Sequence, residues 1–170
     1  ESLTGQTFTD FEVIVVEDGS SCPCRDVVGK YRDRLDVKYY AKDNSGPGQT
    51  RNYGAERSAG EYLIVLDSDC VLPPGYLQAV EDELAREPAD AFGGPDRAHE
   101  SFTPVQKAIN YAMTSFLTTG GIRGGKKKMD KFYPRSFNMG VRSEVYRRLG
   151  GFSKMRFGED IDFSIRIFKA

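Results

Sequence analysis

The chain has 170 residues, the size of one ordinary domain, so its length predicts a single main hydrophobic core. Hydrophobic residues make up 39% and charged residues 29%, a balance too apolar for a disordered tail, and no apolar run approaches the ~20 residues of a membrane helix. Lys plus Arg number 24 against 25 Asp plus Glu, so no overall basic excess indicates nucleic-acid binding.

Hydrophobic periodicity predicts alternating strands and helices in the first ninety residues. The run 11–16 is short, β-branched and apolar and stops at Glu17-Asp18-Gly19, as a buried parallel strand does. By the same reasoning we expect strands over 37–40 and 62–66, and helices over 25–35, 50–59 and from Pro73-Pro74 onward. This alternation is typical of an α/β domain, a three-layer sandwich whose parallel strands are linked by crossover helices.

The second half of the chain is less regular. We expect helices over 102–117, 144–149 and 159–168, with a loop rich in Gly and Lys over 120–131. No internal repeat is visible.

The cysteines do not form a recognisable framework. Cys22, Cys24 and Cys70 cannot all pair within the chain, and Cys22-Pro23-Cys24 is too closely spaced for an ordinary disulfide. The single His99 lies far from them and does not complete a zinc ligand set. We therefore expect inert thiols and a reducing compartment.

Acidic residues directly follow two of the expected strands. Asp18 follows the first, and Asp67-Ser68-Asp69 follows the third. Ligands of such sheets gather at the carboxyl ends of the strands, so we expect both groups to face one crevice. Two carboxylates at this spacing can bind Mg²⁺ or Mn²⁺ together with phosphate oxygens, but Asp69 could equally cap the helix after Pro73.

Four motifs in a fixed order distinguish between these readings. The chain resembles the family 2 glycosyltransferases of the GT-A fold, a Rossmann-like α/β/α sandwich with a mostly parallel central sheet, from about Leu3 to the last residue. The residues that carry the resemblance are Asp18-Gly19-Ser20-Ser21, Asn44-x-Gly46 with Thr50-Arg51-Asn52-x-Gly54, Leu66-Asp67-Ser68-Asp69 and Gly158-Glu159-Asp160, with Asn138-Met139-Gly140 and Gly150-Gly151-Phe152 in addition.

The resemblance implies an enzyme that transfers a sugar, with inversion, from a nucleotide-sugar to a hydroxyl acceptor. The donor is usually a UDP-sugar, and the acceptor is a saccharide or a lipid-linked compound, in polysaccharide, glycolipid or cell-envelope glycan synthesis. It implies one catalytic domain over 1–170, with a nucleotide-binding half over 1–95 and an acceptor-binding half over 96–170. The expected location is the cytoplasm, with peripheral association at the inner face of the membrane left open.

On the donor side, the resemblance assigns Asp18 to the nucleobase or ribose and Arg51 to the base or diphosphate. Asp67 and Ser68 would bind the donor, while Asp69, with Asp67, would bind Mn²⁺ or Mg²⁺. Such a cation stabilises the charge that grows on the departing diphosphate. The plainer alternatives are an Asp-Gly turn at Asp18 and a solvated surface position for Arg51.

On the acceptor side, Asp160 matches the catalytic base, which takes the proton of the attacking hydroxyl. Glu159 would orient the acceptor. The alternative is that Glu159, Asp160 and Asp162 only favour the first turn of a helix, where acids offset the positive end of its dipole.

The stretch 123–128, in a glycine-rich context, carries four basic residues. It could close over the donor, contact an anionic lipid phosphate, or be a solvated loop. Five aromatic residues could stack on an acceptor sugar but are more often core: Tyr111, Phe116, Phe132, Tyr133 and Phe137.

The sequence departs from the family pattern at both ends. The family's first strand, which lies in the middle of its sheet, is not found before Glu1, and residues after Glu159-Asp160 are few. We expect the parent protein to hold both missing parts, and we expect a chain without the first strand to leave its neighbours with unpaired edges. Two rival functions remain: a sugar-nucleotide pyrophosphorylase and an inert nucleotide-sugar binding fragment.

Overall fold

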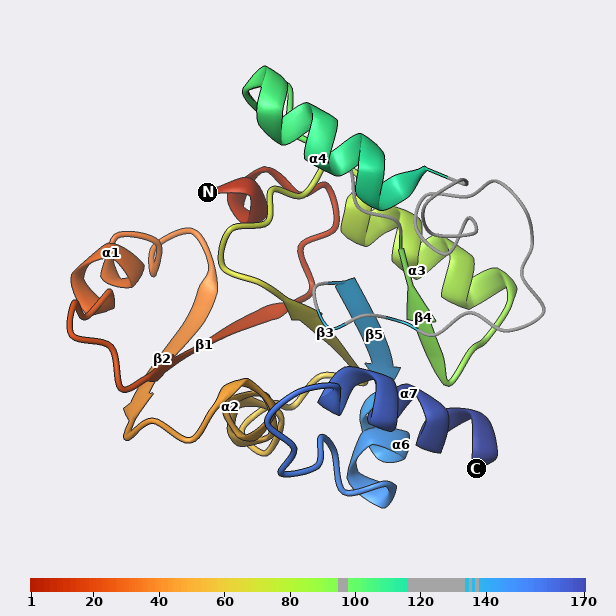
Figure 1. The fold of residues 1–170 in the computed structure, drawn as a ribbon. Coiled ribbons are helices and arrows are strands. Elements are labelled where there is room, and N and C mark those ends of the chain that lie inside the picture. Colours follow the sequence, from red (N-terminus) through yellow and green to blue (C-terminus); the bar gives the residue numbers. More distant parts are fainter. Residues whose placement is uncertain (95–97, 116–133, 135, 137) are drawn as a thin grey trace.

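A computed structural model describes residues 1–94, 98–115, 134, 136 and 138–170 (Figure 1). The strands are β1 (Glu12–Asp18), β2 (Asp36–Lys42), β3 (Tyr62–Leu66), β4 (Ala91–Gly93) and β5 (Asn138–Arg142). The helices are a 3-10 turn η1 (Ser2–Gly5), α1 (Arg25–Gly29), α2 (Pro47–Ala55), α3 (Tyr76–Arg86), α4 (Pro104–Thr114), α6 (Ser143–Arg148) and α7 (Glu159–Lys169).

The strands form two hydrogen-bonded groups. β1 pairs with β2 in parallel, with Val13 opposite Val37, and β5 lies antiparallel between β3 and β4. Among the described residues, β1 and β3 each form a ladder on one side only.

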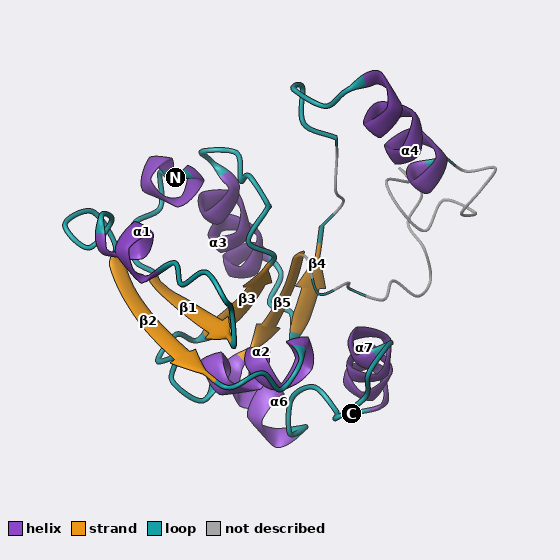
Figure 2. Ribbon diagram, turned by 60° about the vertical axis from the view of Figure 1, so that its left-hand side comes forward, coloured by secondary structure: helices purple, strands orange, loops and turns teal. Residues whose placement is uncertain are grey.

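Helices cover both faces of the strands. Figure 2 shows α3 on one side and α2, α6 and α7 on the other. The core lies on the second side, where Met139 and Val141 of β5 are fully buried beneath Phe152 and Phe163. Between them Gly140 points to the opposite face, where a Cβ would lie 2.0 Å from the ring of Phe92. Because side chains alternate between the two faces along β5, the core lies on the same side as α2, which carries Arg51, and α7, which carries Glu159.

Several elements begin or end away from the expected residues. α1 stops at Gly29 instead of reaching residue 35, because glycine is a poor interior helix residue and the chain continues in tight turns. α2 starts at Pro47 rather than residue 50, since proline suits the first helical position and Gly46 takes φ +85 before it. α3 likewise begins at Tyr76, after Pro73-Pro74.

β4 and β5 were not predicted as strands. β5 reads Asn-Met-Gly-Val-Arg, and its central glycine and polar ends give a weak strand signal, although packing against β3 and β4 holds it in place. None of the helices in the described residues is long and apolar enough to cross a membrane.

Candidate functional site

Asp18 ends β1 and holds the chain that leads into α2. Its Oδ1 atom accepts hydrogen bonds from Lys42 Nζ and from the Ser45 backbone N–H at 2.9 Å. Its Oδ2 atom accepts from the Gly46 N–H, also at 2.9 Å. The side chain of Asn44 in turn donates to the Asp18 carbonyl at 3.0 Å. The acid of the first motif and the glycine of the second are thus in direct contact.

These donors keep Asp18 ionised. Burial alone would raise the pKa of its carboxyl, but the hydrogen bonds from Lys42, Ser45, Thr50 and Gly46 outweigh burial, so that the pKa lies below its ordinary value. The turn reading is also met, because Gly19 takes φ +69 and lies against Asn44. The Asp-Gly turn predicted at this position is therefore present.

Arg51, on α2, joins the two acidic motifs. Its Nη1 lies 3.0 Å from Glu159 Oε1, and its Nη2 lies 3.4 Å from Asp67 Oδ1. The two residues are 108 and 16 positions away from it in sequence. The arginine side chain is only 18% exposed, so the alternative of a solvated surface arginine is wrong.

Glu159 is buried at the start of α7, with 8% of its surface exposed. A Cβ added at Gly48 of α2 would lie 3.2 Å from Glu159 Cγ, so the absence of a side chain at Gly48 lets the two helices approach. Asp160 follows directly, is partly exposed, and accepts the Ile161 N–H at 2.9 Å. Because Arg51 pairs with both Glu159 and Asp67, the first turn of α7 lies near the end of β3.

Asp67, Ser68 and Asp69 lie exposed just after β3. Asp69 does not cap α3, whose N-cap is Gly75 without a side-chain bond, so the capping alternative is wrong. No cluster of three or more His, Cys, Asp or Glu side chains able to hold a metal occurs within the described part of the chain. Two exposed carboxylates still fit Mg²⁺ or Mn²⁺, which take oxygen ligands and leave other positions to water or phosphate.

Sequence reasoning assigned no role to Asn52, Tyr146 or Lys42. Asn52 binds both Tyr146 and the backbone of Phe152, which is 2% exposed and lies beneath the Arg51 guanidinium. Asn52 and Phe152 did stand in quoted motifs, which was the available signal. No sequence signal indicated Lys42, since a lysine at the end of a strand is ordinary.

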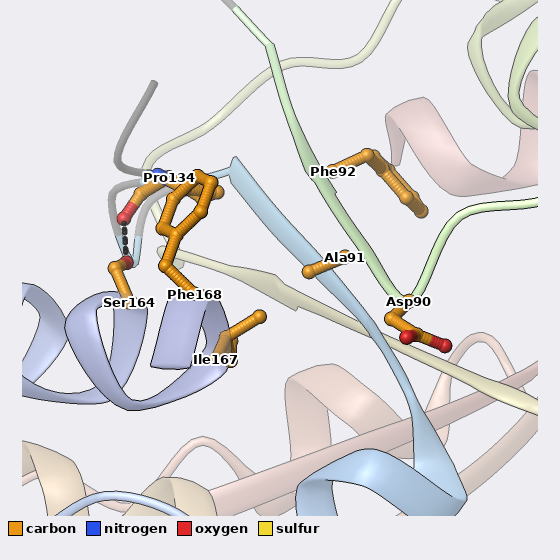
Figure 3. A pocket seen from close by; sticks show the side chains of 7 residues that line it. All are labelled: Asp90, Ala91, Phe92, Pro134, Ser164, Ile167 and Phe168. Atoms are coloured by element: carbon orange, nitrogen blue, oxygen red, sulfur yellow. Dashed lines mark hydrogen bonds between the residues drawn. The ribbon is translucent and has the colours of Figure 1, made fainter. Parts of the chain in front are cut away.

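A cavity of about 330 Å³ lies between α7 and β4 (Figure 3). It is bounded mainly by apolar side chains, among them Ala91, Phe92, Ile167 and Phe168. The Ser164 hydroxyl at its edge donates to the Pro134 carbonyl at 2.8 Å. None of the predicted donor, metal or catalytic residues lines it. The acids, rather than this cavity, define the candidate site.

Some expectations fall outside the described residues. These are the closure or lipid contact of the basic stretch 123–128 and the stacking of Phe116, Phe132, Tyr133 and Phe137. Tyr111, on α4, is 72% exposed and so does not belong to the core.

Comparison with known proteins agrees with the order of motifs. The family model described as "Glycosyl transferase family 2" matches residues 1–150. An uncharacterized glycosyltransferase of Haemophilus influenzae is 28% identical over 99% of this chain and 56% of its own length. Validoxylamine A glucosyltransferase of Streptomyces hygroscopicus is 41% identical over 42% of this chain and 17% of its own. The chain thus spans about half, or less, of the length of these relatives.

Solved structures agree with the fold. The structure of Staphylococcus aureus TarS 1–349 with UDP has a TM-score of 0.76 and 21% identity, covering 98% of this chain and 49% of that one. The mannosyltransferase PcManGT of Pyrobaculum calidifontis, with GDP-Man and Mn²⁺, has a TM-score of 0.69 and 17% identity, covering 98% and 46%. The ordered motifs, the matched family model and this shared architecture show that the chain belongs to glycosyl transferase family 2 and has the GT-A fold.

Proposed function

We propose that this chain is the catalytic domain of an inverting, metal-dependent glycosyltransferase, which moves a sugar from a nucleotide-sugar to a hydroxyl acceptor. One observation carries the proposal. Arg51 bonds both Asp67, of the Asp-x-Asp sequence, and Glu159, the neighbour of Asp160. A single displacement needs a site for the departing diphosphate and a base for the attacking hydroxyl. The two acidic motifs lie on either side of one guanidinium, which supports a donor side and an acceptor side within one site.

The donor nucleotide lies, in this proposal, across the carboxyl ends of β1 and β3. Asp18 accepts from the uracil N–H or a ribose hydroxyl, and Arg51 and Ser68 contact the donor from α2 and from the end of β3. TarS was solved with UDP and with UDP-GlcNAc, which favours a uridine donor. PcManGT was solved with GDP-Man, which makes a guanosine donor the second choice.

Asp67 and Asp69 would hold a divalent cation, Mn²⁺ or Mg²⁺. Their carboxylates are exposed and separated by one residue, at the carboxyl end of β3. When bound, this cation would neutralise negative charge on the leaving diphosphate. The Mn²⁺ in the PcManGT complex supports this choice of ion.

Asp160 acts as the base on the acceptor side. It takes the proton of the acceptor hydroxyl as that oxygen attacks the anomeric carbon. The bond between this carbon and the diphosphate oxygen breaks, and its electron pair leaves with the nucleoside diphosphate. Because the hydroxyl attacks from the face opposite the leaving diphosphate, the configuration of the anomeric carbon is inverted. Glu159, bound to Arg51, orients the acceptor side by fixing the first turn of α7.

The acceptor and the location remain predictions from the family. The acceptor is a saccharide or lipid-linked hydroxyl compound, in polysaccharide, glycolipid or cell-envelope glycan synthesis, and the location is the cytoplasm, with peripheral association at the inner face of the membrane left open. The limits of the two halves, 1–95 and 96–170, also remain predictions.

A thermal-shift screen of the full-length protein tests the donor. The ligands are UDP-GlcNAc, UDP-glucose and GDP-mannose, each with and without Mn²⁺. A ligand at 100 times its Kd adds about 2.7 kcal/mol to the folded state, which raises Tm by roughly 5–10 °C at this domain size. We expect such a rise for one nucleotide-sugar, dependent on Mn²⁺. No shift with any of the three would refute the proposal.

Two further assays separate the rival functions. Release of pyrophosphate from a nucleoside triphosphate and a sugar phosphate would indicate a pyrophosphorylase. Binding of a donor in the screen, with neither transfer nor hydrolysis in the presence of Mn²⁺, would indicate an inert binding domain.

A further inference from the structure

The side chain of Asn52 fastens the loop before α7 to α2. Its Oδ1 accepts from the Phe152 N–H at 2.8 Å and from the Tyr146 hydroxyl at 2.7 Å. Its Nδ2 donates to the Phe152 carbonyl at 2.8 Å. One amide thus binds both backbone polar groups of a residue 100 positions away. Asparagine offers this donor and acceptor pair, whereas aspartate offers acceptors only.

Gly151 gives Asn52 the room for these bonds. A Cβ at Gly151 would lie 2.3 Å from Asn52 Oδ1 and 2.8 Å from Tyr146 Cε1. Gly151 also takes φ +65, a left-handed conformation that favours glycine. The motif that contains Asn52 and the motif that contains Gly151 are therefore in direct contact.

The residue that Asn52 holds, Phe152, connects the site to the core. Its ring centroid lies 5.0 Å from that of Phe163 on α7, and the Arg51 guanidinium carbon lies 5.4 Å from it. Arg51 reaches past this ring to Glu159. Two adjacent residues of α2 thus fix both ends of the segment 152–159, Asn52 at its start and Arg51 at its end.

We propose that Asn52 is a positioning residue of the transfer reaction: by holding Phe152, it sets where the first turn of α7, with Asp160, stands relative to Asp67. The inference deepens the proposed function and rests on it. Asn52 contacts no donor atom in this scheme, because its amide is already bound to Tyr146 and Phe152. Its loss should therefore displace the acceptor-side base and leave nucleotide binding in place.

The variants are N52A and N52D, with Tyr146→Phe as the matched control, all in the full-length protein. N52D keeps the acceptor for the Phe152 N–H but places a carboxylate oxygen against the Phe152 carbonyl in place of the donor, so it serves as the second variant if N52A fails to fold. Tyr146→Phe also removes a polar group from the core, at a residue 4% exposed, but leaves both bonds between Asn52 and Phe152 intact.

Hydrogen exchange of backbone amides measures how firmly Asn52 holds this segment, and the measurement needs no enzymatic activity. In N52A and N52D, we expect backbone amides of 152–160 to exchange roughly tenfold faster than in wild type, because two restraining hydrogen bonds or one are lost. The amides of Ser45 and Gly46, which donate to Asp18, should be unchanged. The Tyr146→Phe protein should match wild type over 152–160. Equal exchange over 152–160 in wild type, N52A and N52D would overturn the proposal.

Kinetics measures the consequence. For UDP release from UDP-GlcNAc with Mn²⁺, kcat of N52A should fall about 100-fold, as a displacement near 1 Å can cause. The Kd of UDP with Mn²⁺, from calorimetry, should stay within about twofold, since the donor-side groups are not contacted by Asn52. Equal losses of kcat in N52A and Tyr146→Phe, or a loss confined to UDP affinity, would overturn it. A wild-type protein that binds no nucleotide would refute the proposed function alone, and the exchange comparison would still decide the role of Asn52.

Discussion

Replacing Arg51 by methionine tests whether the two acidic motifs are held by one charge. Methionine keeps much of the length and packing of the arginine stem but removes the guanidinium. Glu159 then stays in a site where its side chain is 11% exposed, without the cation that lies 3.0 Å away in the native protein. Asp67 loses its partner too, but at 45% exposure it is solvated by water.

The expected cost follows from these exposures. Breaking one side of a buried ion pair costs about 3–5 kcal/mol, whereas an exposed pair contributes at most about 1 kcal/mol. Because both Arg51 and Glu159 keep some contact with solvent, we take the lower end, about 3 kcal/mol in total. At roughly 2–4 °C per kcal/mol for a domain of this size, Tm should fall by about 6–12 °C.

A double-mutant cycle isolates the pair. Urea unfolding is measured for wild type, Arg51→Met, Glu159→Met and the double variant, with Arg86→Met as a control at an exposed ion pair. Removing both charges leaves no uncompensated ion in the interior, so the double variant should recover most of the stability lost in Arg51→Met. The control should change stability by less than about 0.5 kcal/mol.

A double variant no more stable than Arg51→Met would contradict this expectation, because the loss would then come from packing rather than from an unpaired carboxylate. So would an Arg51→Met protein that unfolds at the same urea concentration as wild type. In that case Glu159 would be solvated, and the two motifs would not be held by Arg51.

Three further outcomes are expected. Asp160→Asn should abolish sugar transfer, by a factor of roughly 10² or more, and leave UDP binding by calorimetry unchanged, because it removes only the base; normal transfer by this variant would dispose of that assignment. Asp69→Ala should weaken UDP binding in the presence of Mn²⁺ and leave metal-free UDP binding alone, whereas equal losses with and without Mn²⁺ would remove Asp69 from the metal site. Burial raises the pKa of Tyr146 above its ordinary value of 10, so its contribution to stability is full below pH 10 and is lost as the pH rises beyond it. Thermal melting between pH 8 and pH 11 should therefore decline less in Tyr146→Phe than in wild type, and identical curves would contradict this.

The strands and helices that the sequence predicted best are those with a strong apolar period. β1, β3 and α7 lie close to their expected limits because each presents an uninterrupted apolar run or face. β5 was missed since its burial comes from β3 and β4 on its two sides, and nothing in Asn138–Arg142 itself signals that environment. Local pattern predicts an element that is stabilised by its own surface, and fails where neighbours supply the stability.

The sequence indicated which residues form the candidate site, but it did not indicate the contacts between them. Order in the chain identified Asp18, Arg51, Asp67 and Glu159 as a set, but each was assigned a role toward a ligand. The structure shows their contacts within the protein: Asp18 holds the start of α2, and Arg51 holds the other two acids. Pairings over 100 residues depend on how the helices pack, which no local pattern encodes.

The charges around α2 indicate where a cation is most needed. Lys42 compensates Asp18, but the single charge of Arg51 is shared by two carboxylates, Asp67 and Glu159. Asp69 adds a further negative charge beside them and has no hydrogen-bond or ion-pair partner among the residues that the structure describes. Within that described set, negative charge exceeds positive charge at the end of β3, and a diphosphate brought there would increase the excess. A divalent cation at Asp67 and Asp69, as proposed above, would remove this repulsion, so we expect donor binding to depend on the metal more strongly than on any single side chain.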